Sequence, residues 1–60
     1  MDWLKEIRIS QRLLQEQVAA AAGIERAYYS MIETGKRKPS VNVAQAIANI
    51  LGFEWTRFFE

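Results

Sequence analysis

The sequence predicts an all-α domain made of five short helices. Apolar residues recur at spacings of three and four in several short stretches, and glycine or proline separates these stretches. No stretch of useful length alternates apolar and polar residues as a half-buried strand does. With 60 residues the chain is long enough for one compact domain only. We therefore expect residues 1–60 to form a single domain, marginally stable unless it packs well or dimerises.

The composition excludes several classes of function. Half of the residues are hydrophobic, which favours a compact core over disorder. There is no His and no Cys, so the commonest general base and the commonest metal ligands are missing. There is also no glycine-rich phosphate loop. We expect no enzymatic activity, no metal, no cofactor and no small-molecule ligand. The lack of cysteine and of a long apolar run predicts a cytoplasmic protein without a membrane partner.

The first helix is expected over residues 3–12. Trp3, Leu4 and Ile7 form its apolar stripe, and Asp2 precedes it as a plausible N-cap.

The centre of the chain predicts two helices joined by a tight turn, over Gln15–Ala22 and Arg26–Thr34. Gly23 can adopt a positive φ at little steric cost, which ends the first of these helices within one residue. Two helices joined by a short turn containing glycine form a helix-turn-helix unit. The predicted packing set of this unit is Val18, Ala19, Ala22, Gly23, Ile24, Tyr29 and Ile32.

Two further helices follow the central pair. Gly35 is expected to stop the preceding helix, and Lys36–Pro39 forms a basic loop. Ser40 is a good N-cap for a helix that runs to Leu51. Residues 53–59 form the last short helix.

Positive charge is concentrated in one segment, although the chain as a whole has a net charge of only +1. Residues 26–38 contain one acidic side chain, Glu33, and four basic ones: Arg26, Lys36, Arg37 and Lys38. This segment covers the second helix of the pair and the loop after it, where it would attract phosphate.

The chain resembles the phage repressor/Cro-type (xenobiotic-response-element-like) helix-turn-helix family from about Leu4 to Phe59. The predicted packing set matches the small and apolar positions of that family, and the run IETGKRKPS is similar to its I-E-N-G-K-R-x-P-S pattern. The resemblance implies a compact five-helix domain of the lambda-repressor-like type. It also implies a transcriptional regulator, most often a repressor, that binds double-stranded DNA as a dimer on a pseudo-palindromic operator. In this family the second helix crosses the DNA backbone and the third lies in the major groove.

The resemblance and the outward face of the third helix together give the expected DNA contacts. Arg26 suits a guanine edge, Ala27 a thymine methyl, and Ser30 a base or a phosphate. The expected base contacts are Arg26, Ala27, Ser30 and Met31. The expected phosphate contacts are Gln15, Glu25, Tyr28, Thr34, Lys36, Arg37 and Lys38. Arg8 and Glu33 match a partly buried ion pair that ties the first helix to the end of the third.

The chain departs from the family pattern at three places. Arg12 replaces the usual Gly and Leu14 the usual Thr or Ser, which we expect to cost roughly 1 kcal/mol each and to let the first helix run further. Glu25 replaces the usual Ser or Thr; a carboxylate can still cap a helix, but it repels the DNA backbone. The outward face of the third helix, which is expected to contact the bases and is called the reading face below, is poor in polar side chains, since Ala27 and Met31 lie on it.

An alternative hypothesis follows from this weak reading face. The same fold would then be a protein–protein interaction module or a redesigned scaffold with weak or no DNA binding. Trp55 and Phe58 are expected in the core, whereas Phe59 and Trp3 have no assured burial and favour a homodimer. A chain ending at Glu60 is expected to build any dimer from these helices.

Overall fold

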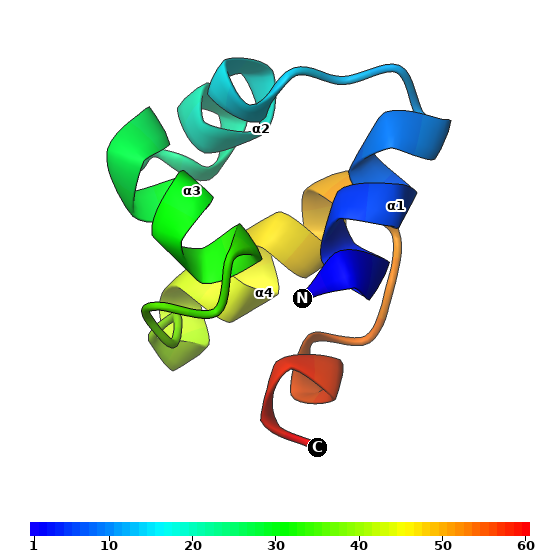
Figure 1. Cartoon of the computed structure of the whole chain (residues 1–60). Coiled ribbons are helices and arrows are strands. Elements are labelled where there is room, and N and C mark those ends of the chain that lie inside the picture. The colour runs from blue at the N-terminus through cyan, green and yellow to red at the C-terminus, as the bar shows by residue number, and fades with distance from the viewer.

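The computed structural model describes the whole chain, Met1–Glu60, as an all-α fold (Figure 1). The chain forms four α-helices and one 3₁₀ helix: α1 (Asp2–Ser10), α2 (Gln15–Ala22), α3 (Arg26–Glu33), α4 (Val41–Leu51) and η1 (Trp55–Phe59). The fold class predicted from the sequence is therefore confirmed, but the count of five helices is not, because only four of the elements are α-helices. The last element is a five-residue 3₁₀ turn, the form that helical segments this short commonly take.

The helices pack around one core. In Figure 1, α4 crosses the middle of the molecule, with α2 and α3 together on one side and α1 on the other. α4 packs against both α2 and η1, while α3 packs against both α2 and α1. The buried core consists of nine residues: Leu4, Val18, Ala19, Tyr29, Ile32, Ala44, Ile47, Leu51 and Phe58. Because every helix contributes to it, the core fixes how α2 and α3 lie relative to α1.

The turn between α2 and α3 depends on the backbone of Gly23. Its φ is +74°, in the left-handed region that glycine adopts most readily. The N–H of Ile24 donates to the carbonyl of Ala19 at 3.0 Å, and the N–H of Gly23 donates to that of Ala20 at 3.1 Å. These two bonds form a Schellman motif, which satisfies the last carbonyls of α2. The predicted end of this helix at Ala22 is confirmed.

The first helix is shorter than its sequence suggests. It runs from Asp2 to Ser10, with Met1 as its N-cap, so Asp2 lies inside its first turn. Arg12 has φ +59°. The prediction that the helix continues to Arg12 is wrong, because a left-handed residue cannot extend a right-handed helix.

We expect glycine to be better than arginine at position 12. In the left-handed conformation, a residue with a side chain loses about 1–2 kcal/mol of folding free energy. Glycine avoids this strain but lowers stability by about 0.4–1 kcal/mol, because it makes the unfolded chain more flexible. Arg12→Gly should therefore raise the free energy of unfolding by about 0.5–1 kcal/mol in urea denaturation, on these two principles. Arg12→Ala, which keeps the strain, is the control and should leave stability nearly unchanged. A destabilised glycine variant would contradict this reading.

The end of the chain closes the fold against α1 and α4. Ser40 caps α4 as predicted, since its Oγ accepts a hydrogen bond from the N–H of Val43 at 3.2 Å. The ring of Phe58 is buried and lies 5.3 Å from that of Trp3 and 5.4 Å from that of Phe53, between centroids. Trp55 is half-buried, and Phe59 remains 44% exposed.

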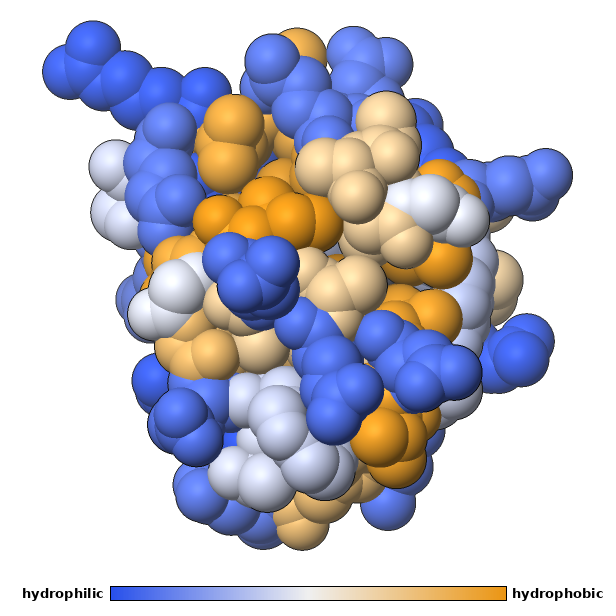
Figure 2. Space-filling view, turned by 180° about the vertical axis from the view of Figure 1, so that it is seen from behind, coloured by the Kyte–Doolittle hydropathy of each residue, from blue (hydrophilic) through white to orange (hydrophobic).

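The surface mixes apolar and hydrophilic side chains. Figure 2, which views the molecule from behind, shows apolar surface broken up by hydrophilic side chains. The large exposed apolar residues are Ile9, Leu14, Val41 and Phe59. No helix combines the length and the apolar character needed to cross a membrane.

Candidate nucleic-acid interface

A buried ion pair joins α1 to the end of α3. Arg8 Nε donates to Glu33 Oε2 at 2.9 Å, and Arg8 Nη2 donates to Glu33 Oε1 at 3.0 Å. The two side chains are only 9% and 4% exposed. A third bond, from Arg8 Nη1 to the carbonyl of Leu13 at 2.7 Å, reaches the α1–α2 junction. The structure thus brings together the two residues that the family resemblance pairs, and the pair spans three segments of the fold.

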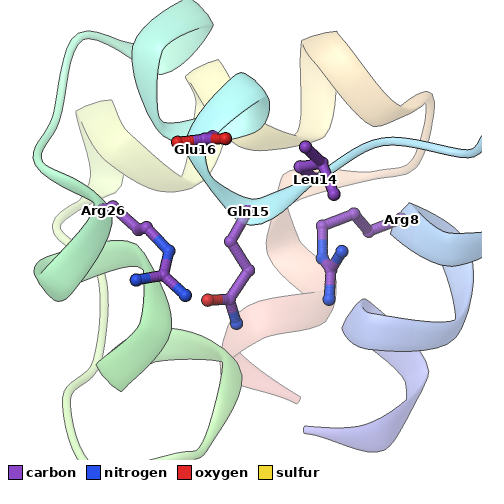
Figure 3. Close-up of a pocket in the computed structure, with 5 residues that line it drawn as sticks. All are labelled: Arg8, Leu14, Gln15, Glu16 and Arg26. Atoms are coloured by element: carbon purple, nitrogen blue, oxygen red, sulfur yellow. The ribbon is translucent and has the colours of Figure 1, made fainter.

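The same pair holds Gln15 at the beginning of α2. Gln15 Nε2 donates to Glu33 Oε1 at 3.1 Å. Figure 3 shows the polar ends of Arg8, Gln15 and Arg26 in a row, so that α1, α2 and α3 each contribute one side chain. These three residues, with Leu14 and Glu16, line a shallow pocket of about 350 Å³. Gln15 is therefore oriented by Glu33 beside Arg26.

Burial and hydrogen bonding shift the pKa of Glu33 in opposite directions. Burial acts to raise the pKa of Glu33, but hydrogen bonds from Arg8 and other neighbours, Gln15 among them, outweigh it and the pKa is lowered. The pKa of Arg8 is raised, chiefly by its hydrogen bond to Glu33. Burial also raises the pKa of the neighbouring Tyr29 hydroxyl. The pair is therefore fully charged at neutral pH.

Acid should weaken the fold through Glu33. Because its pKa is lowered from 4.5 on folding, the carboxylate contributes stability that is complete above about pH 4.5 and is lost as pH falls through the folded-state pKa. We expect urea midpoints to be similar at pH 7 and 6 and to fall between pH 4.5 and 3. Glu33→Gln removes this titration, so its midpoint should fall less over the same range. A midpoint that rises on acidification would contradict the lowered pKa.

The outer face of α3 carries the predicted base-contact residues. Arg26 and Ala27 are exposed in its first turn, while Ser30 and Met31 are half-buried further along. Glu25 is the N-cap of α3, but its side chain makes no capping hydrogen bond. Its carboxylate therefore lies on the surface next to Arg26 and does not use its capacity to cap the helix.

The loop after α3 folds back onto the helix. Gly35 has φ +82°, and the carbonyl of Met31 accepts hydrogen bonds from the N–H of Lys36 at 2.9 Å and of Arg37 at 3.2 Å. Thr34 Oγ1 donates to the same carbonyl at 3.2 Å. The side chains of Thr34, Lys36, Arg37 and Lys38 are exposed, and Pro39 is buried behind them. The loop is thus a fixed turn that presents its basic side chains to solvent.

Residues 26–38 expose more positive charge than their composition suggests. Glu33 is neutralised by Arg8 in the only salt bridge of the structure. The four basic side chains of the segment, Arg26, Lys36, Arg37 and Lys38, are exposed and form no salt bridge. Beside α3 the nearest exposed carboxylate in sequence is Glu25. An anion approaching this side meets a net positive charge, which the Glu25 carboxylate reduces beside Arg26.

One residue that stabilises the beginning of α2 was not predicted from the sequence. Gln17 Oε1 accepts a hydrogen bond from the N–H of Leu14 at 2.8 Å at the beginning of α2. This is one half of a capping box, in which the residue at N3 satisfies the N-cap N–H. Glutamine at N3 is a sequence signal for this hydrogen bond. The motif is difficult to recognise here, because it normally begins with Ser or Thr and this chain has Leu14.

The amino-acid sequence that forms this arrangement matches one family of proteins. The family model for helix-turn-helix proteins matches residues 4–58. The chain belongs to this family. The match covers most of α1, all of α2 to α4 and most of η1, so it includes the ion pair, the turn at Gly23 and the basic loop.

Two relatives extend the comparison within this helix-turn-helix family. The chain is 59% identical over 58 residues to the uncharacterized HTH-type transcriptional regulator YqaF of Bacillus subtilis (strain 168), covering 97% of this chain and 76% of that protein. It is 35% identical over 51 residues to the immunity repressor protein of Bacillus phage phi105, covering 85% of this chain and 35% of the repressor. The chain thus spans about a third of the phage protein. No solved structure matches the chain.

Proposed function

We propose that this chain is a transcriptional regulator that acts as a repressor and binds double-stranded DNA in a sequence-specific manner. The observation that carries the proposal is a set of four exposed basic side chains without a salt bridge on α3 and its loop, within a helix-turn-helix: Arg26, Lys36, Arg37 and Lys38. Similarity to a transcriptional regulator and to a phage repressor supports it.

In the proposed complex, α3 lies in the major groove and the two flanking segments contact phosphates. Gln15 at the beginning of α2 is one such contact, because free N–H groups and a positive dipole end lie there. The loop from Thr34 to Lys38 is the other. Arg26 reads a guanine, and Ala27, Ser30 and Met31 line the groove with smaller or apolar contacts. Glu25 and Tyr28 lie at the edge of this face, close to the backbone phosphates in the proposed complex, where the Glu25 carboxylate opposes binding.

We further propose that two copies bind a pseudo-palindromic operator. Dimeric helix-turn-helix proteins place their recognition helices about 34 Å apart, in successive major grooves. One copy measures 25 × 20 × 18 Å, so two copies in contact are large enough to span that distance. Phe59, which is 44% exposed, is an apolar side chain that such a contact would cover. Sedimentation equilibrium at high protein concentration tests this, and a strict monomer would count against it.

Affinity for a random duplex at 50 and 200 mM salt tests the proposed function directly. Phosphate contacts release counterions, so affinity should fall steeply with salt. Negligible binding at the lower salt would reject DNA binding and favour the protein-interaction alternative.

Arg26 should determine preference at one base pair. A bidentate contact to guanine is worth about 1–3 kcal/mol of discrimination, so Arg26→Ala should relax selection at one position and leave the others unchanged. Selection from a random duplex library followed by sequencing measures this. Lys5→Ala removes an exposed basic residue from α1 and serves as the control, with no change expected. Unchanged preference in the Arg26 variant would mean that the first turn of α3 does not face the bases.

A further inference from the structure

An aromatic ring on α3 lies against the basic loop. The guanidinium carbon of Arg37 is 5.7 Å from the centroid of the Tyr28 ring. Tyr28 is half-buried at the flank of α3, and Arg37 is exposed. A guanidinium within about 6 Å of an aromatic face is attracted by the quadrupole of the ring. Among the exposed basic residues of the loop, only Arg37 has a side-chain partner of this kind.

The backbone of the loop brings the two residues together. Because the carbonyl of Met31 accepts from the N–H groups of both Lys36 and Arg37, the chain turns back at the end of α3. The Arg37 guanidinium then lies over the ring of Tyr28 on α3. A folded-back loop and a ring contact together restrict where the guanidinium can lie.

We infer that Tyr28 is a positioning residue, which holds the Arg37 guanidinium against α3 in the place where a DNA phosphate reaches it. This inference rests on the proposed function. An exposed arginine that is free in solution loses side-chain freedom when it binds, and this loss opposes binding. Arg37 has already lost part of that freedom, because the ring restrains it before DNA arrives. This positioning depends on the aromatic ring of Tyr28 and not on its hydroxyl.

Two substitutions separate the ring from the hydroxyl. Tyr28→Leu should weaken binding to every duplex about two- to fivefold, which corresponds to 0.5–1 kcal/mol for an exposed cation–π contact. Tyr28→Phe keeps the ring and should retain more affinity than Tyr28→Leu. Arg37→Ala should cost about two- to fivefold less in the Tyr28→Leu background than alone. Urea denaturation of each variant shows whether stability has changed.

Two outcomes of this cycle would overturn the inference. If Tyr28→Phe weakens binding as much as Tyr28→Leu, the hydroxyl contacts DNA and the ring is not the cause. If Tyr28→Leu and Arg37→Ala weaken binding independently, Tyr28 does not act through Arg37.

A measurement without DNA separates this inference from the proposed function. In the free protein, the Arg37 δ-methylene protons should be shifted upfield in NMR spectra by the Tyr28 ring. The shift should remain in Tyr28→Phe and disappear in Tyr28→Leu. If the chain binds duplex but the upfield shift is absent, only the positioning role is overturned. If the shift is present but no duplex binds, the proposed function fails, and the positioning role fails with it.

Discussion

Replacing Glu33 with alanine should remove most of the stability of this domain. Breaking a buried ion pair by deleting one partner costs about 3–5 kcal/mol, because the remaining charge is left buried without compensation. A domain of 60 residues has only about 3–9 kcal/mol of stability in total. Glu33 also accepts the hydrogen bond from Gln15, so its loss releases α2 as well. Urea denaturation followed by circular dichroism measures the effect.

Two further variants identify the cause of this loss. Glu6→Ala removes an exposed carboxylate from α1 and should change stability by no more than about 0.5 kcal/mol. The double variant Arg8→Met/Glu33→Leu replaces both charges with apolar groups and should recover most of the stability. If the double variant is as unstable as Glu33→Ala, the unpaired charge of Arg8 is not the reason. A cost below about 1 kcal/mol for Glu33→Ala would contradict the importance of the pair.

Removing the three basic side chains of the loop should weaken DNA binding for all sequences alike. In the variant Lys36→Ala/Arg37→Ala/Lys38→Ala, roughly 1 kcal/mol for each lost phosphate contact gives about a hundredfold loss of affinity at low salt. The slope of log affinity against log salt should become shallower by about 2.7, since each phosphate contact contributes about 0.9. Fluorescence anisotropy with a labelled duplex at several salt concentrations measures both quantities.

The loop variant has a direct control on α1. Lys5→Ala removes an exposed positive charge that lies outside the proposed interface and should leave the salt slope unchanged. Base preference should survive in the loop variant, because phosphate contacts carry no sequence information. Equal slopes for the loop variant and the unmodified chain would show that the loop does not touch DNA.

The sequence predicts this fold well wherever a local signal has a single meaning. Gly23 ends α2 because only glycine adopts its positive φ readily, and Ser40 caps α4 through its own hydroxyl. The end of α1 was missed because Arg12 adopts a left-handed conformation that arginine rarely takes. The sequence predicts the last element only as a short helix, because the spacing of Trp55, Phe58 and Phe59 does not reveal the tighter 3₁₀ geometry.

In the candidate site, too, some features can be predicted from the sequence and others cannot. Exposed residues such as Arg26 and Lys36 are visible in the sequence as charge on a helix and a loop. The contacts between elements are not, because they depend on distances between residues far apart in the chain. The hydrogen bond from Gln15 to Glu33 and the stacking of Arg37 on Tyr28 appear only when α2, α3 and the loop are folded together. These contacts orient side chains whose chemistry the sequence already suggests.

Backbone amide shifts in ¹⁵N-labelled protein, followed during titration with duplex DNA, test the central claim most directly. If α3 and its flanking segments form the interface, the largest changes should occur at the beginning of α2, in the first half of α3 and at residues 36–38. Residues of α1 before Arg8 and those of η1 should change little. Largest changes in η1 and around Trp3, with none in the first turn of α3, would contradict the account.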